Sequence, residues 1–162
     1  MSPAAPERAF QQTVLDRLLD DEPGSTVERP VSRVESLARL KQNVRRDLEW
    51  LLNTRRTIQP APKELVELSA SLYHYGIPDL SSMSADSPET QGELTRLVGD
   101  AIDTFEPRLA EVNVTGVPQD QRKLGELRFV IDALLRLDPT PERVTFDTLL
   151  ETGKGLVQIS GA

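Results

Sequence analysis

The sequence lacks cysteine and has one histidine among its 162 residues. Without cysteine the chain forms no disulfide bond and no thiolate metal site. His74 could complete a zinc site only with carboxylates, so a structural or surface role is expected for it. No apolar run approaches the roughly 20 residues of a membrane span, and no basic flank precedes a hydrophobic segment at the N-terminus. These absences predict a cytoplasmic protein without membrane insertion.

Motifs for cofactor or nucleophilic chemistry are missing as well. The sequence contains no Gly-rich phosphate loop and no Gly-x-Ser-x-Gly elbow, so we expect no cofactor, no metal and no catalytic residue. The one carboxylate that deserves a test as a catalyst is Glu106. A glycosidase needs a carboxylic acid that stays protonated, whereas Arg108, two residues later, favours the ionised form. The sequence therefore predicts a protein that is not an enzyme, with a peptidoglycan glycosidase using Glu106 as the alternative.

Acidic residues outnumber basic ones, and the formal net charge is -7. This balance argues against general affinity for nucleic acid, which depends on neutralising phosphates. Residues 29–56 depart from it, because they hold eight of the 19 basic groups and three acidic ones, a local charge of +5. An adaptor that binds anionic partners through this segment is one hypothesis that follows.

Helical periodicity dominates the first two thirds of the sequence. Residues 7–20 predict a short amphipathic helix, and residues 21–32 a linker. A helix capped by Ser32 or Ser36 is expected to run to about Thr54, with one apolar stripe: Leu37, Leu40, Val44, Leu48 and Leu51. Trp50 lies off this stripe beside Arg46. It therefore makes either a second contact within the chain or a contact with a partner.

Two further helices are expected before the pattern changes. Residues 63–73 predict a short helix with its leucines inward (Leu65, Leu68 and Leu72), followed by a turn over 73–78. A second helix should start at Ser87-Pro88 and end at Pro107. Proline at 107 excludes Glu106 from the helical region, so Glu106 and Arg108 should flank a rigid turn.

The remainder has the two-residue period of strands. Residues 127–137 alternate over a long strand with one buried face, and shorter strands are expected over 112–117, 144–150 and 156–159. Strands that follow one another through short turns pair antiparallel. The predicted fold class is α+β, with N-terminal helices packed on a small, mainly antiparallel C-terminal sheet.

Four motifs in order resemble one known family. They are Leu-Asp-Arg-Leu-Leu-Asp (15–20), Arg-Arg-Asp-Leu-Glu-Trp-Leu-Leu-Asn-Thr-Arg-Arg (45–56), Tyr-Gly-Ile-Pro-Asp-Leu (75–80) and Phe-Glu-Pro-Arg-Leu (105–109). Together they resemble the TssE-type baseplate wedge protein of type VI secretion systems, related to the lysozyme-like wedge protein of contractile phage tail baseplates. The resemblance implies residues 1–30 as an N-terminal helix and linker, and 31–162 as the lysozyme-like wedge domain.

The resemblance also implies a function. Members of that family are structural subunits of a membrane-docked baseplate, contact wedge subunits of the TssF and TssG type, and start assembly of the contractile sheath. Glu106, Pro107 and Arg108 match the Glu-Pro-Arg motif associated with docking on the wedge core.

The basic run over 45–56 supplies the other candidates for partner binding, although the resemblance gives them no role: Arg45, Arg46, Trp50, Arg55 and Arg56. Tryptophan and arginine are enriched at interface hot spots. A sheath strand could add to a sheet edge through main-chain hydrogen bonds. Residues 156–159 are the candidate edge, with the strand at Val112 as the alternative.

Overall fold

The computed structural model describes residues 10, 13–19, 23–24, 32–59, 61–62, 64–80, 87–118, 126–151 and 154–161. The chain forms two units, residues 1–44 and 45–162. Most of the expected linker over 21–32 lies outside the described residues, and the division into 1–30 and 31–162 stays a prediction. Among the described helices, none combines the length and hydropathy needed to cross a membrane.

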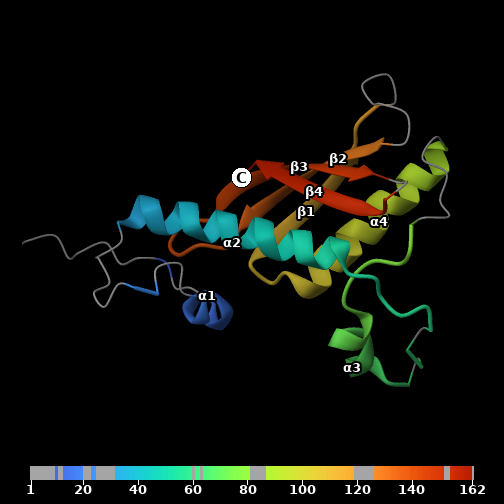
Figure 1. The fold of residues 1–162 in the computed structure, drawn as a ribbon, viewed down its shortest axis with the longest axis horizontal. Helices are drawn as coiled ribbons and strands as arrows, with labels where there is room; N and C mark the ends of the chain where they lie inside the picture. The colour runs from blue at the N-terminus through green and yellow to red at the C-terminus, as the bar shows by residue number, and fades with distance from the viewer. Residues whose placement is uncertain are drawn as a thin grey trace, which may run out of the picture. The chain divides into compact units, whose positions relative to one another are not determined.

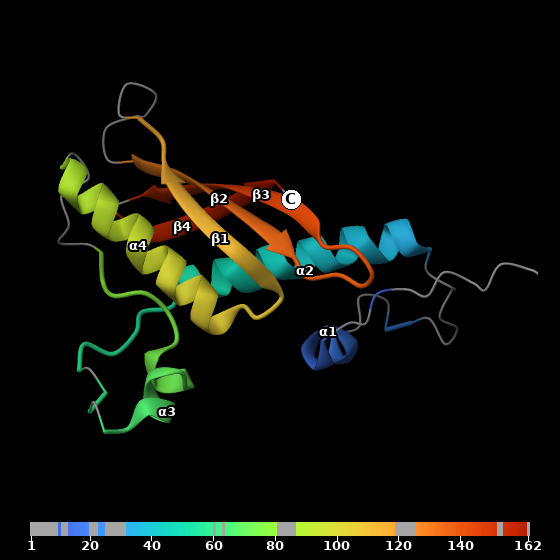
Figure 2. The same cartoon turned by 180° about the vertical axis from the view of Figure 1, so that it is seen from behind.

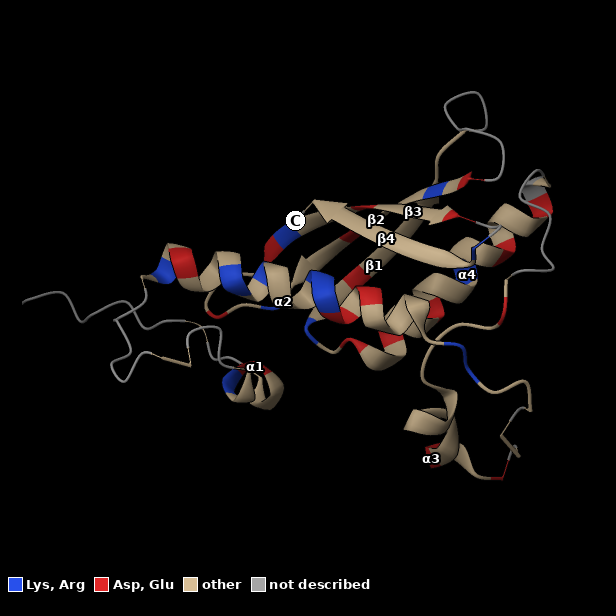
Figure 3. Cartoon of the chain, in the orientation of Figure 1, with Lys and Arg blue, Asp and Glu red and all other residues tan. Residues whose placement is uncertain are grey.

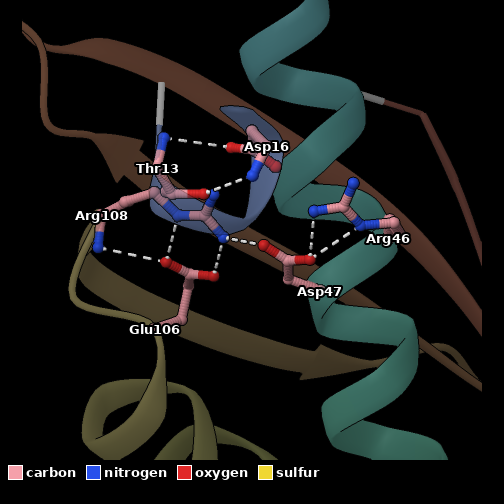
Figure 4. Close-up of polar contacts among 6 residues, drawn as sticks. All are labelled: Thr13, Asp16, Arg46, Asp47, Glu106 and Arg108. Atoms are coloured by element: carbon pink, nitrogen blue, oxygen red, sulfur yellow. Dashed lines mark hydrogen bonds and ion pairs between the residues drawn. The ribbon is translucent and has the colours of Figure 1, made fainter. Parts of the chain in front are cut away.

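In the first unit, helix α1 (Val14–Leu18) is shorter than the sequence predicts. Thr13 has an extended backbone, and its hydroxyl accepts a hydrogen bond from the Asp16 N–H at 3.2 Å while the Asp16 carboxylate accepts from the Thr13 N–H. This capping box, drawn in Figure 4, fixes the start of the helix at Val14. Phe10, which the periodicity placed in the helix, is not helical. It donates its N–H to Ser36 Oγ at 2.9 Å instead.

Helix α2 (Arg33–Asn53) begins in the first unit and ends in the second. Ser32 is its cap, because its hydroxyl accepts a hydrogen bond from the Glu35 N–H at 3.2 Å. Ser36, the other candidate, is occupied by Phe10. The predicted apolar stripe is confirmed, with Leu37 half-buried and the other members buried: Leu40, Val44, Leu48 and Leu51.

The predicted helix over 63–73 is wrong in length and in burial. The structure has a four-residue helix α3 (Val66–Ser69) and a separate 3-10 turn η1 (Leu72–His74). The Ser71 hydroxyl accepts the Tyr73 N–H and starts the second turn, a local hydrogen bond that competes with continued helix. Leu72 is 84 % exposed rather than inward. The lone histidine has a structural contact, since His74 Nε2 accepts the Ala61 N–H at 2.9 Å.

The rest of the second unit is one helix and one sheet, shown in Figure 1. Helix α4 spans Pro88–Phe105 and is followed by strands β1 (Leu109–Gly116), β2 (Glu126–Leu135), β3 (Glu142–Glu151) and β4 (Leu156–Gly161). The strands pair antiparallel in the order β1-β2-β3-β4. The predicted α+β fold is confirmed.

The core of this unit lies on one face of the sheet. The strand predicted over 127–137 ends two residues early, at Leu135, and Leu137 beyond it is only half-buried. The other alternating residues predicted for it are buried: Leu127, Phe129, Ile131, Ala133 and Leu135. Alternate residues of β3 and β4 share that face. Leu48, Leu51 and Leu52 of α2 and the apolar stripe of α4 are buried with them. Figure 2 shows α4 alongside β1, at one side of the sheet.

An isolated parallel β-bridge between Arg55 and Ile77 joins the end of α2 to the segment before α4. Ile77 donates its N–H to the Thr54 carbonyl and accepts the Arg56 N–H, both at 3.0 Å. Gly76 precedes this bridge with φ +104°, and a Cβ there would lie 2.2 Å from the Thr54 carbonyl oxygen. Only glycine fits, because any other residue meets both left-handed strain and a backbone clash.

We expect Gly76→Ala to lower the free energy of unfolding of the chain by about 3 kcal/mol. Gly92→Ala is the matched control, because Gly92 lies in α4 with no atom within 4 Å of the added Cβ. That change should stabilise the helix by about 0.5 to 1 kcal/mol. Urea titration of both variants measures the two effects, and equal stability of the two would contradict the role of Gly76.

Candidate docking surface

The Glu106-Pro107-Arg108 motif forms the turn between α4 and β1. The helix ends at Phe105, and Glu106 leaves the helical region with φ -119° and ψ 79° while its N–H still donates to the Ile102 carbonyl at 2.8 Å. Proline at 107 imposes this stop, as the sequence predicts. Pro107 is exposed, whereas Glu106 is 5 % exposed. The motif therefore shows its proline to solvent and buries its carboxylate.

Arg108 holds both oxygens of the Glu106 carboxylate. Its Nε donates to Oε1 at 2.6 Å, its Nη2 donates to Oε2 at 2.5 Å, and its backbone N–H donates to Oε1 at 3.2 Å. A two-pronged pairing of this kind is the strongest geometry available to a guanidinium and a carboxylate. Because the partners are two residues apart, the pairing fixes the turn from within.

The same guanidinium also reaches helix α2. Arg108 Nη2 donates to Asp47 Oδ2 at 2.5 Å, and Asp47 Oδ1 accepts from Arg46 Nε at 2.9 Å and Nη2 at 2.8 Å. Figure 4 shows the resulting chain of alternating charges, Glu106 to Arg108 to Asp47 to Arg46. We call these four residues the charged corner. It links the α4–β1 turn to α2, which is 61 residues earlier in the sequence.

The electrostatics keep the corner charged. Burial by itself lowers the pKa of Arg108, but hydrogen bonds and the negative charges of Glu106 and Asp47 outweigh that effect and raise the pKa. The guanidinium therefore stays ionised wherever the protein is folded. Tyr75 also interacts with the negative charges of the corner. Burial raises the pKa of its hydroxyl, and the charges of Asp47 and Glu106 raise that pKa further.

Trp50 is 49 % exposed, and its contact with a partner stays a prediction. The Arg46 guanidinium lies 4.9 Å from the centre of its ring, a cation–π contact on one side of the indole. Arg46 thus connects the charged corner to an exposed aromatic side chain on α2.

The two arginines at the end of the basic run differ in surroundings. Arg55 Nη2 donates to the Gly155 carbonyl at 2.9 Å, and its Nε lies 3.6 Å from Asp79. Arg55 therefore ties the β3–β4 turn to the end of α2. Arg45 is exposed and Arg56 half-exposed, and neither guanidinium has a hydrogen-bond or ion-pair partner among the described residues. Figure 3 shows acidic residues interleaved with the basic ones along α2.

Sequence reasoning missed three residues of this region: Asp47, Glu49 and Asn53. It treated Asp47 as one of the few acids in a basic run, and no local pattern indicates a pairing with Arg108. Glu49 and Asn53 both contact the backbone of β4. Their spacing of four places them on one face of α2, which is the only signal that the sequence offered.

The arrangement offers little for bond chemistry. Both oxygens of Glu106 are engaged by Arg108, and the described residues contain no group of three or more side chains that could hold a metal ion. A general acid has to carry a proton. Protonation of Glu106 would remove the charge that Arg108 pairs with.

The charged corner should contribute strongly to stability. We expect Arg108→Met to lower the free energy of unfolding by about 3 kcal/mol, because Glu106 is left as an unpaired buried charge. Glu106→Gln should cost less in the Arg108→Met background than alone, with a coupling energy of about 1 to 3 kcal/mol. Denaturant titration of the two single variants and the double variant measures this cycle.

The control is Arg96→Met, since Arg96 and Asp100 form an ion pair on α4 with both side chains 63 % exposed. Its effect should stay below about 0.5 kcal/mol. Equal small effects at Arg108 and Arg96 would show that the corner does not hold the fold.

The family model described as "Baseplate wedge protein gp25" matches residues 38–140. A chain of the solved structure "The baseplate complex from the type VI secretion system" is similar with a TM-score of 0.48 and 20% identity, over 69% of this chain and 94% of that one. No curated protein matches. The family match includes α4, the charged corner and strands β1 and β2, and it ends before β3. The chain belongs to the gp25 family of baseplate wedge proteins.

Proposed function

We propose that this protein is a non-enzymatic structural subunit of a type VI secretion baseplate that docks on wedge subunits and starts sheath assembly. The observation that carries the proposal is the family match over residues 38–140. The order of the four sequence motifs supports the type VI system in particular. The protein acts on the cytoplasmic side of a membrane-docked baseplate, and its partners are wedge subunits of the TssF and TssG type.

The proposed docking surface consists of exposed or partly exposed residues of the second unit: Arg45, Trp50, Arg55, Arg56 and Pro107. Pro107 projects from a turn whose geometry Glu106 and Arg108 fix, so it meets a partner without loss of conformational freedom. Trp50, half exposed and stacked on Arg46, is the aromatic anchor. Arg45 and Arg56 supply charges at the rim. Arg55 is exposed as well and also bonds to the Gly155 carbonyl.

Sheath assembly uses the sheet. Strands β1 and β4 are its two edges, and an edge strand offers backbone N–H and C=O groups to an extended arm of another protein. Such an addition needs no cofactor and no covalent step. Strand addition would align the first sheath subunits with the sheet of this protein.

The glycosidase alternative has less support. Glu106 would have to carry a proton as a general acid, while Arg108 binds it as a carboxylate. Asp47, the nearest second carboxylate, is engaged by two arginines. Both carboxylates of the corner are thus paired with arginine, and this arrangement favours a structural role.

Docking predicts that Trp50→Ala and Pro107→Ala each reduce co-purification with TssF-type and TssG-type wedge subunits by at least about tenfold, because each removes an exposed anchor. Thermal unfolding should show that both variants remain folded. Leu72→Ala is the control, since Leu72 is 84 % exposed and lies outside the proposed surface. Undiminished co-purification of both anchor variants would refute this docking surface.

A turbidity assay on peptidoglycan tests the alternative directly. We expect the purified chain to clear the suspension no faster than a Glu106→Gln variant, because neither form presents a free general acid. Clearance that depends on Glu106 would replace the structural proposal with an enzymatic one. Because Glu106 is buried, its replacement can disturb the fold. Far-ultraviolet circular dichroism should therefore show that the Glu106→Gln variant remains folded.

A further inference from the structure

Residues 75–80 carry the motif Tyr-Gly-Ile-Pro-Asp-Leu, and we call this segment the strap. Two of its side chains anchor it in the core, since Ile77 is 1 % exposed and Leu80 is 2 % exposed. At its start the ring of Tyr75 meets the ring of Phe105, the last residue of α4, with centroids 5.3 Å apart and planes at 71°. The strap therefore touches α4 directly before the α4–β1 turn.

The strap also pairs with the backbone at the end of α2. Ile77 donates its N–H to the Thr54 carbonyl and accepts the Arg56 N–H, both at 3.0 Å. The Thr54 hydroxyl donates to the Trp50 carbonyl at 2.6 Å. Two of the proposed docking residues are thus tied to the strap, Arg56 directly and Trp50 through Thr54.

An ion pair is the weakest of the contacts that hold the strap. Asp79 Oδ1 lies 3.6 Å from Arg55 Nε, and the two side chains are 60 % and 35 % exposed. Water screens a pair of this kind, so it adds little to stability. Burial and backbone pairing therefore hold the strap in place, and the ring of Tyr75 is the part of it that contacts α4.

Tyr75 lies close to the charged corner as well as to α4. Burial raises the pKa of its hydroxyl, and the negative charges of Asp47 and then Glu106 raise that pKa further. The hydroxyl therefore stays neutral at neutral pH and adds no charge to the corner. Aromatic rings that meet edge to face prefer a defined relative orientation. Contact with Tyr75 therefore limits the movement of Phe105 and of the last turn of α4.

Little slack separates the two contacts of the strap. Only Gly76 lies between Tyr75 and Ile77, and the chain spans at most about 7 Å over two residues. Gly76 has φ +104°, a conformation in which other residues are strained. The ring contact with α4 and the backbone pair with the end of α2 are therefore set by three consecutive residues.

We propose that Tyr75 is a positioning residue for docking, which presets the Pro107 turn relative to the end of α2 before a wedge subunit binds. The inference rests on the proposed function and adds to it the residue that sets the geometry of the docking surface. Glu106 and Arg108 fix the shape of the turn from within, whereas Tyr75 fixes Phe105, from which the turn starts. A surface that already has its bound geometry loses less conformational freedom on binding. Tyr75 strengthens docking in this way without touching the partner.

NMR relaxation tests the positioning on the protein alone. In the unchanged chain we expect the backbone amides of Glu106 and Arg108 to have order parameters of about 0.85, the value of rigid backbone. Tyr75→Ala should lower them toward about 0.6, the value of flexible backbone. Tyr75→Phe, which keeps the ring, should leave them unchanged. So should the matched control Tyr73→Ala, because the ring of Tyr73 lies against His74, with centroids 5.2 Å apart. Unaltered order parameters in Tyr75→Ala would overturn the inference.

Binding then tests the effect on docking. The probe is a purified complex of TssF-type and TssG-type wedge subunits. We expect Tyr75→Ala to bind this complex about tenfold more weakly than the unchanged chain, because the turn then has to be ordered on binding. Tyr75→Phe and Tyr73→Ala should both bind with the affinity of the unchanged chain.

A double-mutant cycle separates positioning from a general loss of folded protein. Partial unfolding caused by Tyr75→Ala would lower the affinity by the same factor whatever residue stands at 107. Positioning acts through Pro107 instead. Tyr75→Ala should therefore weaken binding by about tenfold in the unchanged chain and by about twofold or less in the Pro107→Ala background. A tenfold loss in both backgrounds would overturn the inference.

The two proposals fail in different ways. If the unchanged chain does not bind the wedge complex, the proposed function fails, and the inference fails with it. If the unchanged chain binds and Tyr75→Ala binds equally well, docking stands and the positioning role of Tyr75 is refuted.

Discussion

The pairing of Arg108 with two carboxylates is the interaction on which the second unit depends. Glu106 and Asp47 come from different elements, and neither could be buried as an isolated charge. Arg108 satisfies both, so the α4–β1 turn cannot move without leaving a charge unpaired. The position of Pro107 on the surface is a consequence of this buried arrangement. A motif that looks like a surface ion pair in the sequence is in fact an internal support.

Within the Glu-Pro-Arg motif, Pro107 is exposed while Glu106 and Arg108 bond to each other inside the chain. If all three residues faced a partner, their substitution would affect binding alone. Because Glu106 and Arg108 are engaged within the chain, their loss acts first on the fold and through it on any surface nearby. The same holds for Arg55, which the β3–β4 turn occupies. Among the residues proposed for docking, Trp50 and Pro107 are the exposed ones whose substitution tests contact with a partner most directly.

Local patterns predicted the fold where one periodicity dominates. Strand β2 alternates over ten residues, and α2 follows a regular stripe, so both were predicted with correct burial. The helix over 63–73 was wrong because leucine spacing says nothing about Ser71, whose hydroxyl ends one turn and starts another. The charged corner was predicted in part. Its turn follows from Pro107. The contact between Arg108 and Asp47 joins residues 61 apart, so no local sequence pattern predicts it.

Helix α2 connects the two sites because it carries both sets of contacts within a few residues. Asp47 holds the charged corner, and Glu49 and Asn53 hold the edge of β4. Residues two apart on a helix point to different sides, and residues four apart to the same side. One helical segment therefore faces the α4–β1 turn with one side and the sheet edge with another. The stretch from Asp47 to Asn53 therefore holds both the α4–β1 turn and the backbone of β4 through side chains of one helix.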